Sequence, residues 1–208
     1  MTWHRNYPSV ETVLFDFGGV LAEEGFRNGL EAIALHHRLD PESFIRTAFD
    51  TIYVTGYVLG KANEHTFWNA MRKATGIDGE DAVLRGQILS RFVLRDWMMD
   101  IVKTFRYRNI RTGILSDQTD WLDYLDKQCD FFRWFDVIFN SYHLGKGKRD
   151  PEHFRDVLTA LHTEANRVLF IDDDAGHCER ARSWGMQVIH YTEKRAFLAD
   201  ILKIMPHS

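Results

Sequence analysis

The chain has 208 residues, 45% of them hydrophobic, which is enough for one substantial core or for a core plus a small accessory domain. Its formal net charge of −4 lacks the basic excess that favours nucleic acid or acidic membranes, and no apolar run or leading segment suggests a membrane span or secretory signal. The two cysteines, Cys129 and Cys178, form no C-x-x-C pair or metal-ligand pattern. We therefore expect a protein of the reducing cytoplasm.

The first part of the chain predicts one strand followed by helices. An irregular lead-in over residues 1–10 precedes a strand over residues 11–17. From residue 22 to 95 the pattern is helical, with an N-cap and a first-turn proline at Asp40-Pro41 and a second helix start at Asn63. No strand alternation interrupts this stretch. We predict an all-helical insert.

The rest of the chain alternates between helices and strands. The predicted helices cover residues 97–107, 120–127, 151–162, 176–184 and 193–204, and the predicted strands cover residues 111–115, 137–140, 168–171 and 187–191. Strands separated by helices of this length indicate a parallel sheet. The predicted fold is α/β, a doubly wound parallel sheet formed by residues 1–21 and 96–208, with a helical cap of residues 22–95 inserted after the first strand.

Polar side chains follow several of these strands. Asp16 ends the first strand, Ser116 the second, and Asp172 with Asp173 a later one, while Lys148 lies in a glycine-flanked loop. Carboxyl ends of parallel strands meet at the edge where α/β proteins bind ligands. Three carboxylates there need a cation or protons to coexist, and Mg²⁺ fits such a set. With a hydroxyl and an ammonium to hold phosphate oxygens, the pattern predicts phosphoryl transfer.

Each residue also has a simpler explanation when it is taken alone. Asp16 could cap a turn, the acids of residues 172–174 could cap the next helix, and Lys148 could be a solvated charge. We expect Asp174 to act only as such a cap. The basic and aromatic stretch over residues 103–111 is interpreted as a solvated helix face rather than an RNA site. We expect the insert's large rings in the cap core rather than at the substrate: Tyr53, Tyr57 and Trp68.

Four motifs in order resemble those of the haloacid dehalogenase-like hydrolases with a helical cap. They are VLFDFGGVL, GILSD, LGKGKRDPEHF and VLFIDDDAGHCERARSWGM, and together they span nearly the whole chain. The first and third are closest in wording to the subgroup that contains α-D-glucose-1-phosphate phosphatase. The resemblance implies a doubly wound core with Asp16 as nucleophile, Ser116 as phosphoryl ligand and Lys148 as catalytic cation. It also implies that Mg²⁺ is bound by Asp172 and Asp173, with Asp173 the direct ligand.

The resemblance extends to neighbouring residues, and the departures from it matter. It implies substrate binding by Phe17, Gly18 and Asp117 as well as Ser116 and Lys148, and Mg²⁺ binding by Asp16 and the Gly18 carbonyl. The family's first motif usually reads Asp-x-Asp, and its second acid moves the proton, but Gly18 stands at that position. Asp117 replaces a common asparagine, and it either repels phosphate or serves as a substitute donor. Arg149 follows the lysine where proline is usual.

These observations predict an enzyme, a Mg²⁺-dependent phosphatase acting on a small phosphomonoester, such as a sugar phosphate, through a phospho-Asp16 intermediate. The alternative is a catalytically weak or inactive fold of the same family that binds a phosphorylated ligand or a protein partner. The expected partner is a small phosphorylated metabolite, with neither nucleic acid nor membrane involved. We expect a monomer or homodimer.

Overall fold

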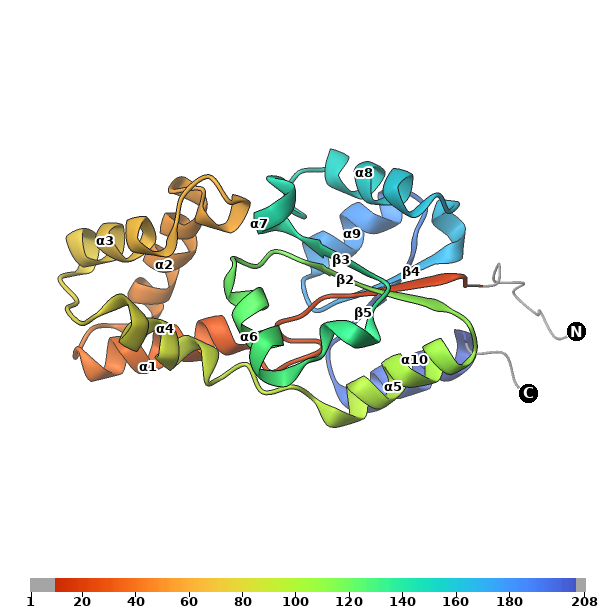
Figure 1. Ribbon diagram of the computed structural model, residues 1–208, viewed down its shortest axis with the longest axis horizontal. Coiled ribbons are helices and arrows are strands. Elements are labelled where there is room, and N and C mark those ends of the chain that lie inside the picture. The colour runs from red at the N-terminus through yellow and green to blue at the C-terminus, as the bar shows by residue number, and fades with distance from the viewer. Residues whose placement is uncertain (1–9, 205–208) are drawn as a thin grey trace, which may run out of the picture.

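The computed structural model describes residues 10–204, and its centre is one parallel sheet (Figure 1). Neighbouring strands follow the order β3-β2-β1-β4-β5. Phe15 of β1 lies beside Ile114 of β2 and Ile171 of β4, so the three central strands end at one edge. The strands are β1 (Thr12–Phe15), β2 (Arg111–Ser116), β3 (Val137–Asn140), β4 (Val168–Asp172) and β5 (Gln187–His190). The chain runs from β1 through β2 to β3 on one side, then crosses back to β4 and β5 on the other side of β1, so a topological switch point lies at β1.

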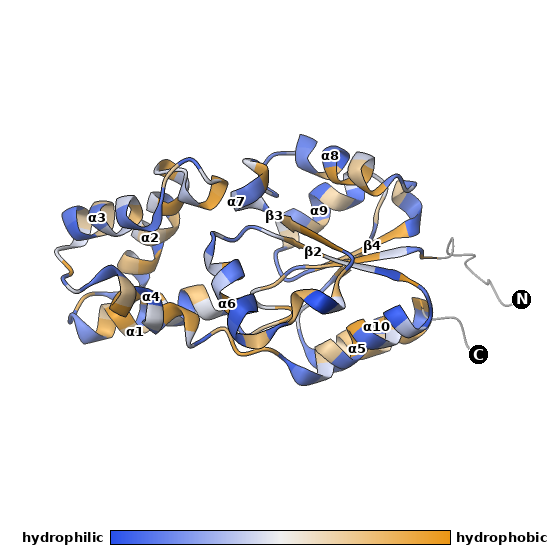
Figure 2. Cartoon of the chain, viewed as in Figure 1, coloured by the Kyte–Doolittle hydropathy of each residue, from blue (hydrophilic) through white to orange (hydrophobic). Residues whose placement is uncertain are grey.

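Helices cover both faces of this sheet. In Figure 1, α8 (Glu152–Leu161) and α9 (Ala175–Ser183) lie on one face, and α5 (Asp96–Tyr107) and α10 (Lys194–Ile204) on the other. Strand β1 is wholly buried because its alternate side chains enter two cores, Leu14 on one face and its neighbours Val13 and Phe15 on the other. In Figure 2, α5 and α8 carry both hydrophobic and hydrophilic residues, as amphipathic covering helices do.

Residues between β1 and α5 form four longer helices at the carboxyl edge of the sheet (Figure 1). The Asp40 carboxylate caps the second of them by accepting from Ser43 N–H at 2.8 Å, and Asn63 caps the third by accepting from Thr66 N–H at 3.0 Å. We call residues 22–95 the helical insert. Its helices are α1 (Gly25–His36), α2 (Pro41–Val54), η1 (Tyr57–Leu59), α3 (Glu64–Thr75) and α4 (Asp81–Leu89).

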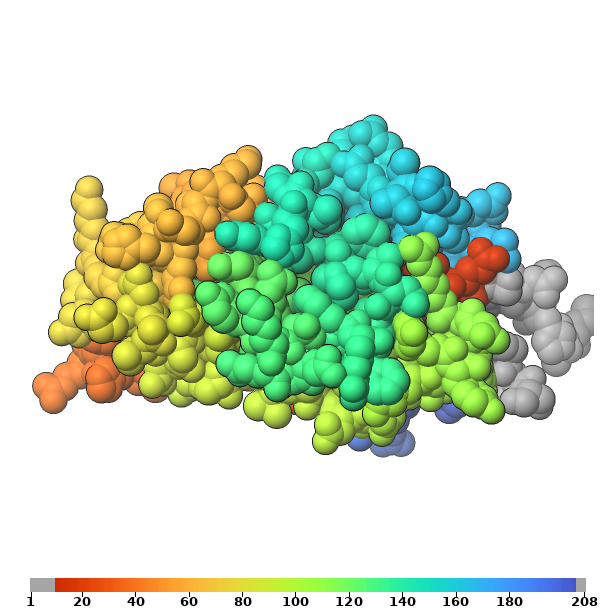
Figure 3. All heavy atoms as spheres, viewed as in Figure 1, coloured from red at the N-terminus to blue at the C-terminus, as the bar shows by residue number. Residues whose placement is uncertain are grey.

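The helical insert packs directly on the core rather than on itself alone. Trp121, at the start of α6 (Trp121–Cys129), is 1% exposed and contacts the rings of Tyr57 and Trp68, with centroids 5.7 and 6.1 Å away. Tyr57 and Trp68 are fully buried, which confirms their predicted place in a core. Figure 3 shows the orange and yellow insert in contact with the green and cyan core. The remaining short elements are η2 (Phe132–Trp134), α7 (Ser141–Leu144) and η3 (Ala165–Arg167).

The observed elements follow the predicted order, with one shift at the first strand. Strand β1 ends at Phe15, not at residue 17, because the backbone turns after Asp16 and Gly19 has a φ of +81°. The predicted lead-in, apart from Val10, lies outside the described residues, as does the start of the predicted core. Within residues 10–204, no helix is long and apolar enough to cross a membrane.

His153 of α8 makes the stability of this fold depend on pH. Its side chain is buried, its Nε2 atom has no hydrogen-bond partner within residues 10–204, and burial lowers its pKa. The unfolded chain therefore binds a proton near pH 6.5 that the folded chain does not, and acid below that pH favours unfolding. When the pH falls from about 7.5 to about 5.5, the wild type should lose more free energy of unfolding than His153→Leu. The difference should be on the order of 1 kcal/mol, measured by urea unfolding. Equal losses in both proteins would contradict this.

Candidate active site

The ends of two adjacent strands bring three carboxylates together. Asp16 follows β1, Asp172 ends β4, and Asp173 follows it. One carboxylate oxygen of each lies within 4.8 Å of the others, and we call these three residues the carboxylate cluster. Their closeness follows from the parallel sheet, which places neighbouring strand ends at one edge. Hard oxygen donors this close together could hold a divalent cation.

Lys148 supplies the positive charge at the base of the cluster. Its side chain is 1% exposed, with Nζ 2.9 Å from Asp16 Oδ1 and 2.6 Å from Asp172 Oδ2. Burial alone would lower the pKa of Lys148, but the two carboxylates raise it above its ordinary value. Lys148 is therefore a buried ammonium and not a solvated surface charge.

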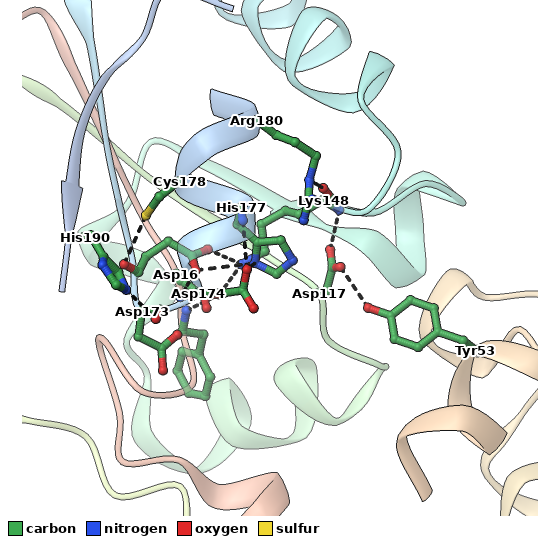
Figure 4. Close-up of polar contacts among 12 residues, drawn as sticks. Asp16, Tyr53, Asp117, Lys148, Asp173, Asp174, His177, Cys178, Arg180 and His190 are labelled. Atoms are coloured by element: carbon green, nitrogen blue, oxygen red, sulfur yellow. Dashed lines mark hydrogen bonds and ion pairs between the residues drawn. The ribbon is translucent and has the colours of Figure 1, made fainter. Parts of the chain in front are cut away.

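The backbone of Lys148 is fixed on both sides. Its N–H donates to Asp117 Oδ1 at 2.8 Å, and its carbonyl accepts from Arg180 Nε of α9 at 2.7 Å (Figure 4). A Cβ at Gly147 would lie 2.7 Å from the same Asp117 oxygen, so the loop needs glycine before the lysine to approach this carboxylate. These contacts hold the ammonium in place without using its own donors.

Asp16 lies at the inner end of the pocket, close to Lys148. Its side chain is 12% exposed and its Oδ1 accepts from Phe17 N–H at 2.8 Å. Burial raises the pKa of Asp16, Lys148 opposes this, and Asp172 raises it further, while the Ser116 side chain makes a hydrogen bond that lowers it. Ser116 is buried at the end of β2, so the structure brings together the predicted nucleophile, hydroxyl and ammonium.

The two acids after β4 have different surroundings. Asp172 is fully buried, and both oxygens accept from the protein: Oδ2 from Lys148 Nζ, and Oδ1 from Asp174 N–H at 2.7 Å. Burial would raise the pKa of Asp172, but Lys148 and then His177 hold it well below its usual range. Asp172 is thus an ionised partner of Lys148.

Asp173 turns its carboxylate toward the pocket, although much of the residue is exposed. The carboxylate lies so close to Gly19 that a Cβ there would overlap it, and Gly19 also has positive φ. Burial of the carboxylate, then Asp16 and Asp172, raise the pKa of Asp173 to about 7. A cation bound between Asp16 and Asp173 would favour the ionised form of both.

At the start of α9, Asp174 caps the helix and His177 lines the pocket. Asp174 Oδ1 accepts from His177 N–H at 2.8 Å, which confirms that Asp174 caps this helix. His177 lines the pocket, with Nδ1 3.4 Å from Asp172 Oδ1. The sequence signal for a role of His177 is only its place about one helical turn after the acids.

Tyr53 of the helical insert reaches the same loop. Its hydroxyl donates to Asp117 Oδ2 at 3.0 Å (Figure 4). The Arg149 guanidinium carbon lies 3.6 Å from the centroid of its ring. Burial, then Asp117, raise the pKa of Tyr53. Tyr53 lines the pocket, so the expectation that it lies only in the cap core was wrong. No sequence pattern indicates this place, because the position of Tyr53 depends on how the insert packs against the core.

A pocket of about 300 Å³ opens above these groups, between the sheet edge and the helical insert. Gly18 lines it, but Phe17 does not: the Phe17 ring is buried in the core, stacked on Phe131 with centroids 5.2 Å apart. Only the Phe17 backbone is near the site. The remaining lining from the core includes Asp16, Ser116, Asp117, Gln118, Lys148 and Asp173, and that from the insert includes Glu24, Phe26, Arg27, Phe49 and Tyr53.

This combination of a parallel sheet, an acid after the first strand, a buried lysine and paired acids defines a class of hydrolase. A model of the haloacid dehalogenase-like hydrolase family matches residues 10–182. The chain belongs to the haloacid dehalogenase-like hydrolases. The narrower resemblance to α-D-glucose-1-phosphate phosphatases stays a prediction.

Known proteins resemble this chain at low identity. A haloacid dehalogenase family enzyme from Bacteroides thetaiotaomicron has a TM-score of 0.74 and 20% identity, covering 92% of this chain and 98% of its own. That enzyme has also been crystallised in complex with magnesium and inorganic phosphate. Enolase-phosphatase E1 of Streptomyces avermitilis is 27% identical over 57% of this chain and 52% of its own. Bifunctional epoxide hydrolase 2 of Rattus norvegicus is 26% identical over 51% of this chain. The match spans only 20% of that relative.

Proposed function

We propose that this protein is a Mg²⁺-dependent phosphatase that hydrolyses a small phosphomonoester through an aspartyl-phosphate at Asp16. One observation carries the proposal: the buried Lys148 ammonium lies within 2.9 Å of Asp16 Oδ1, at the inner end of a pocket that Asp16 and Asp173 of the carboxylate cluster also line. A nucleophile of this kind splits the hydrolysis into two displacements at phosphorus. The magnesium and phosphate complex of the Bacteroides enzyme supports the same chemistry.

The residues present fit a Mg²⁺ ion. Asp16 and Asp173 would hold it, with the Gly18 carbonyl as a further donor, and Asp172 would support the site through Lys148. The donors are all oxygen, and the single ammonium leaves the cluster with excess negative charge, so a hard cation suits it. When bound, Mg²⁺ supplies positive charge for the substrate phosphate oxygens.

The protein's own residues would carry out the remaining steps. Asp16 attacks the phosphorus atom, while the Ser116 hydroxyl and the Lys148 ammonium hold the phosphoryl oxygens and stabilise their charge. The Asp117 contact fixes Lys148 in the required position before substrate binds. The helical insert forms the outer wall of the pocket and keeps bulk water from the phosphoryl group.

The pocket sets the kind of substrate. A volume of about 300 Å³ is at the lower end for small-molecule sites, so the leaving group is small, such as a sugar or a compound of similar size. Phe26, Phe49 and Tyr53 offer ring surfaces, and Arg27 a positive charge at the rim. Within the proposal, the partner is a phosphorylated metabolite and the protein acts in the cytoplasm as a monomer or homodimer.

A screen of phosphate release tests this function. Sugar phosphates and aromatic phosphates would be supplied with and without Mg²⁺, and released phosphate measured. We expect turnover of at least one substrate, lost on chelation of the metal. The absence of turnover with every substrate, while phosphate analogues still bind, would favour the alternative of a binding protein, to which the glycine at position 18 points.

Two adjacent acids offer a matched test of the metal site. Asp173 belongs to the carboxylate cluster, whereas Asp174 caps α9. We expect Asp173→Ala to raise the Mg²⁺ concentration needed for half-maximal activity by about 10-fold or more, because a cation ligand is lost. Asp174→Ala should cost about 1 kcal/mol of stability and leave the metal requirement almost unchanged. Equal effects on the metal requirement would show that the ligand assignment is wrong.

A further inference from the structure

Hydrolysis of an ordinary phosphomonoester needs a proton for the departing oxygen. A positioned acid contributes about 10²–10⁴-fold to such a step. Gly18 has no side chain to supply this proton, although its backbone lines the pocket beside Asp16. A donor must therefore come from elsewhere around the pocket. The acids that line it are Asp16, Glu24, Asp117, Asp173 and Asp174.

Four of these acids already have another role or hydrogen-bond partner. Asp16 is the nucleophile and Asp173 a cation ligand in the proposed function. Asp117 accepts from Lys148 N–H on one oxygen and from the Tyr53 hydroxyl on the other. Asp174 accepts from His177 N–H as the cap of α9. Glu24 remains.

The Glu24 carboxylate approaches the space that a side chain at position 18 would enter. A Cβ on Gly18 would lie 4.0 Å from Glu24 Oε1. The other oxygen, Oε2, accepts from Arg27 N–H at 2.7 Å, so Glu24 caps α1. Within residues 10–204, no further hydrogen bond reaches the Glu24 side chain. One oxygen is thus fixed at the helix end, and the other is left unpaired on the pocket side.

The segment that carries Glu24 is held against the Asp16 turn. Gly18 pairs with Ala22 in an isolated bridge, and Ala22 pairs with Leu94 in another. Glu23 N–H donates to the Val93 carbonyl at 2.9 Å. These backbone contacts fix the distance between the Asp16 turn and the start of α1. The Arg27 N–H contact in turn holds the Glu24 carboxyl group at this helix start.

The surroundings of Glu24 also favour its protonated form. Burial raises the pKa of this carboxyl group, and the nearby Asp16 adds to the rise, while the Arg27 N–H and the Arg27 charge oppose it. A larger share of Glu24 is therefore protonated than of an exposed glutamate at the same pH. This suits a group that first donates a proton and then accepts one.

We propose that Glu24 is the general acid and base of this active site and takes the place of the carboxylate that position 18 lacks. The inference rests on the proposed phosphatase function. In the first displacement, an Asp16 oxygen bonds to phosphorus, the bond from phosphorus to the leaving oxygen breaks, and that oxygen takes the Glu24 proton to leave as an alcohol. In the second, the Glu24 carboxylate removes a proton from water, whose oxygen bonds to phosphorus. The bond from phosphorus to Asp16 breaks, and phosphate leaves.

The test compares Glu24→Gln with the wild type on aryl phosphates whose leaving groups differ in pKa. Glutamine keeps an oxygen to cap α1 but has no proton to transfer at this pH. First-turnover release of the phenol is measured by rapid mixing. We expect the variant to lose about 10²-fold or more with phenyl phosphate and far less with dinitrophenyl phosphate. Its slope of log rate against leaving-group pKa should be clearly more negative than that of the wild type.

A second readout follows the base role. With dinitrophenyl phosphate, Glu24→Gln should release one equivalent of phenol quickly and then turn over slowly, because the aspartyl-phosphate lacks a base for its hydrolysis. A helix cap alone would produce neither this burst nor a change of slope. Glu23→Gln is the matched control, because the neighbouring Glu23 pairs with Arg95 at 2.9 Å and does not line the pocket. It should keep the wild-type slope.

Two further variants make the result independent of folding defects. Glu24→Asp keeps a good cap, but its carboxyl group is one methylene short of the pocket, so it should also steepen the slope. Adding Gly18→Asp to Glu24→Gln should flatten the slope again. Gly18 has no positive φ, and the nearest atom to a Cβ there is Phe92 Cε1 at 3.2 Å, on a side chain that can shift slightly.

The outcomes separate the two proposals. Wild-type slopes in both Glu24→Gln and Glu24→Asp, with normal turnover, would overturn the role of Glu24 and leave the phosphatase function standing. No phenol or phosphate release by the wild type from any substrate would overturn the phosphatase function and, with it, the need for an acid.

Discussion

Replacing Asp16 with asparagine should abolish phosphate release while leaving the fold intact. The amide has no free charge with which to attack phosphorus, so the loss should be on the order of 10⁴-fold or more. Asp16 is buried near Asp172 and Asp173, and its raised pKa means that the folded protein disfavours its ionised form. Neutralising it should therefore maintain or raise the melting temperature. Inactivity with undiminished stability would show that the Asp16 carboxylate serves catalysis and not the fold.

The measurement pairs phosphate release with thermal unfolding of the same preparations. Asp156→Asn is a suitable control, because Asp156 is an exposed partner of Lys146 and lies outside the pocket. It should retain nearly full activity. If Asp16→Asn kept a tenth of wild-type activity or more, the covalent mechanism would be wrong. If it failed to fold, the argument that Asp16 carries a functional rather than a structural charge would fail.

Of the substitutions proposed for this protein, Lys148→Met should lower the free energy of unfolding most. The ammonium is buried between Asp16 and Asp172, and its removal leaves two buried carboxylates without a counter-charge. Breaking a buried ion pair from one side costs about 3–5 kcal/mol. We expect a loss of that order in the free energy of unfolding by urea at neutral pH, together with a loss of activity.

Two comparisons isolate the electrostatic cause of that loss. Lys146→Met changes a more exposed lysine in the same loop, which pairs with Asp156 at the surface, and should change the free energy of unfolding far less. Adding Asp172→Asn to Lys148→Met removes one of the unpaired charges, so it should recover part of the stability without any activity. A Lys148→Met protein as stable as the wild type would contradict the buried ion pair.

The sequence predicted most of the fold and much of the site, for a physical reason. The alternation of helices and strands predicts a parallel sheet, and parallel strands end at one edge. The acids that follow β1 and end β4 therefore lie near Ser116 of β2. The approach of Lys148 to Asp16 could be expected from motif order alone, and the structure places the two within ion-pair distance.

The residues that sequence reasoning missed depend on tertiary contacts. Glu24 looks like one acid of a pair at the start of a helix, and nothing in the sequence distinguishes it from Glu23, which pairs with Arg95. The Tyr53 hydroxyl meets Asp117 only because α2 packs over the sheet edge. Both side chains belong to the insert and extend toward residues of the core. The local periodicity of the sequence carries no information about such contacts.

The packing of Trp121 has a consequence for cooperativity. Its ring lies among aromatic side chains of the helical insert, and the same hydrophobic cluster continues to Phe15 of β1. The insert therefore has no apolar core of its own that is separate from the sheet. If it melted first, it would expose the aromatic surface of α6 to water, which makes such an intermediate unfavourable. The two parts of the chain should therefore unfold together in one transition. A substitution that lowers the stability of the insert should lower the stability of the active site by the same amount.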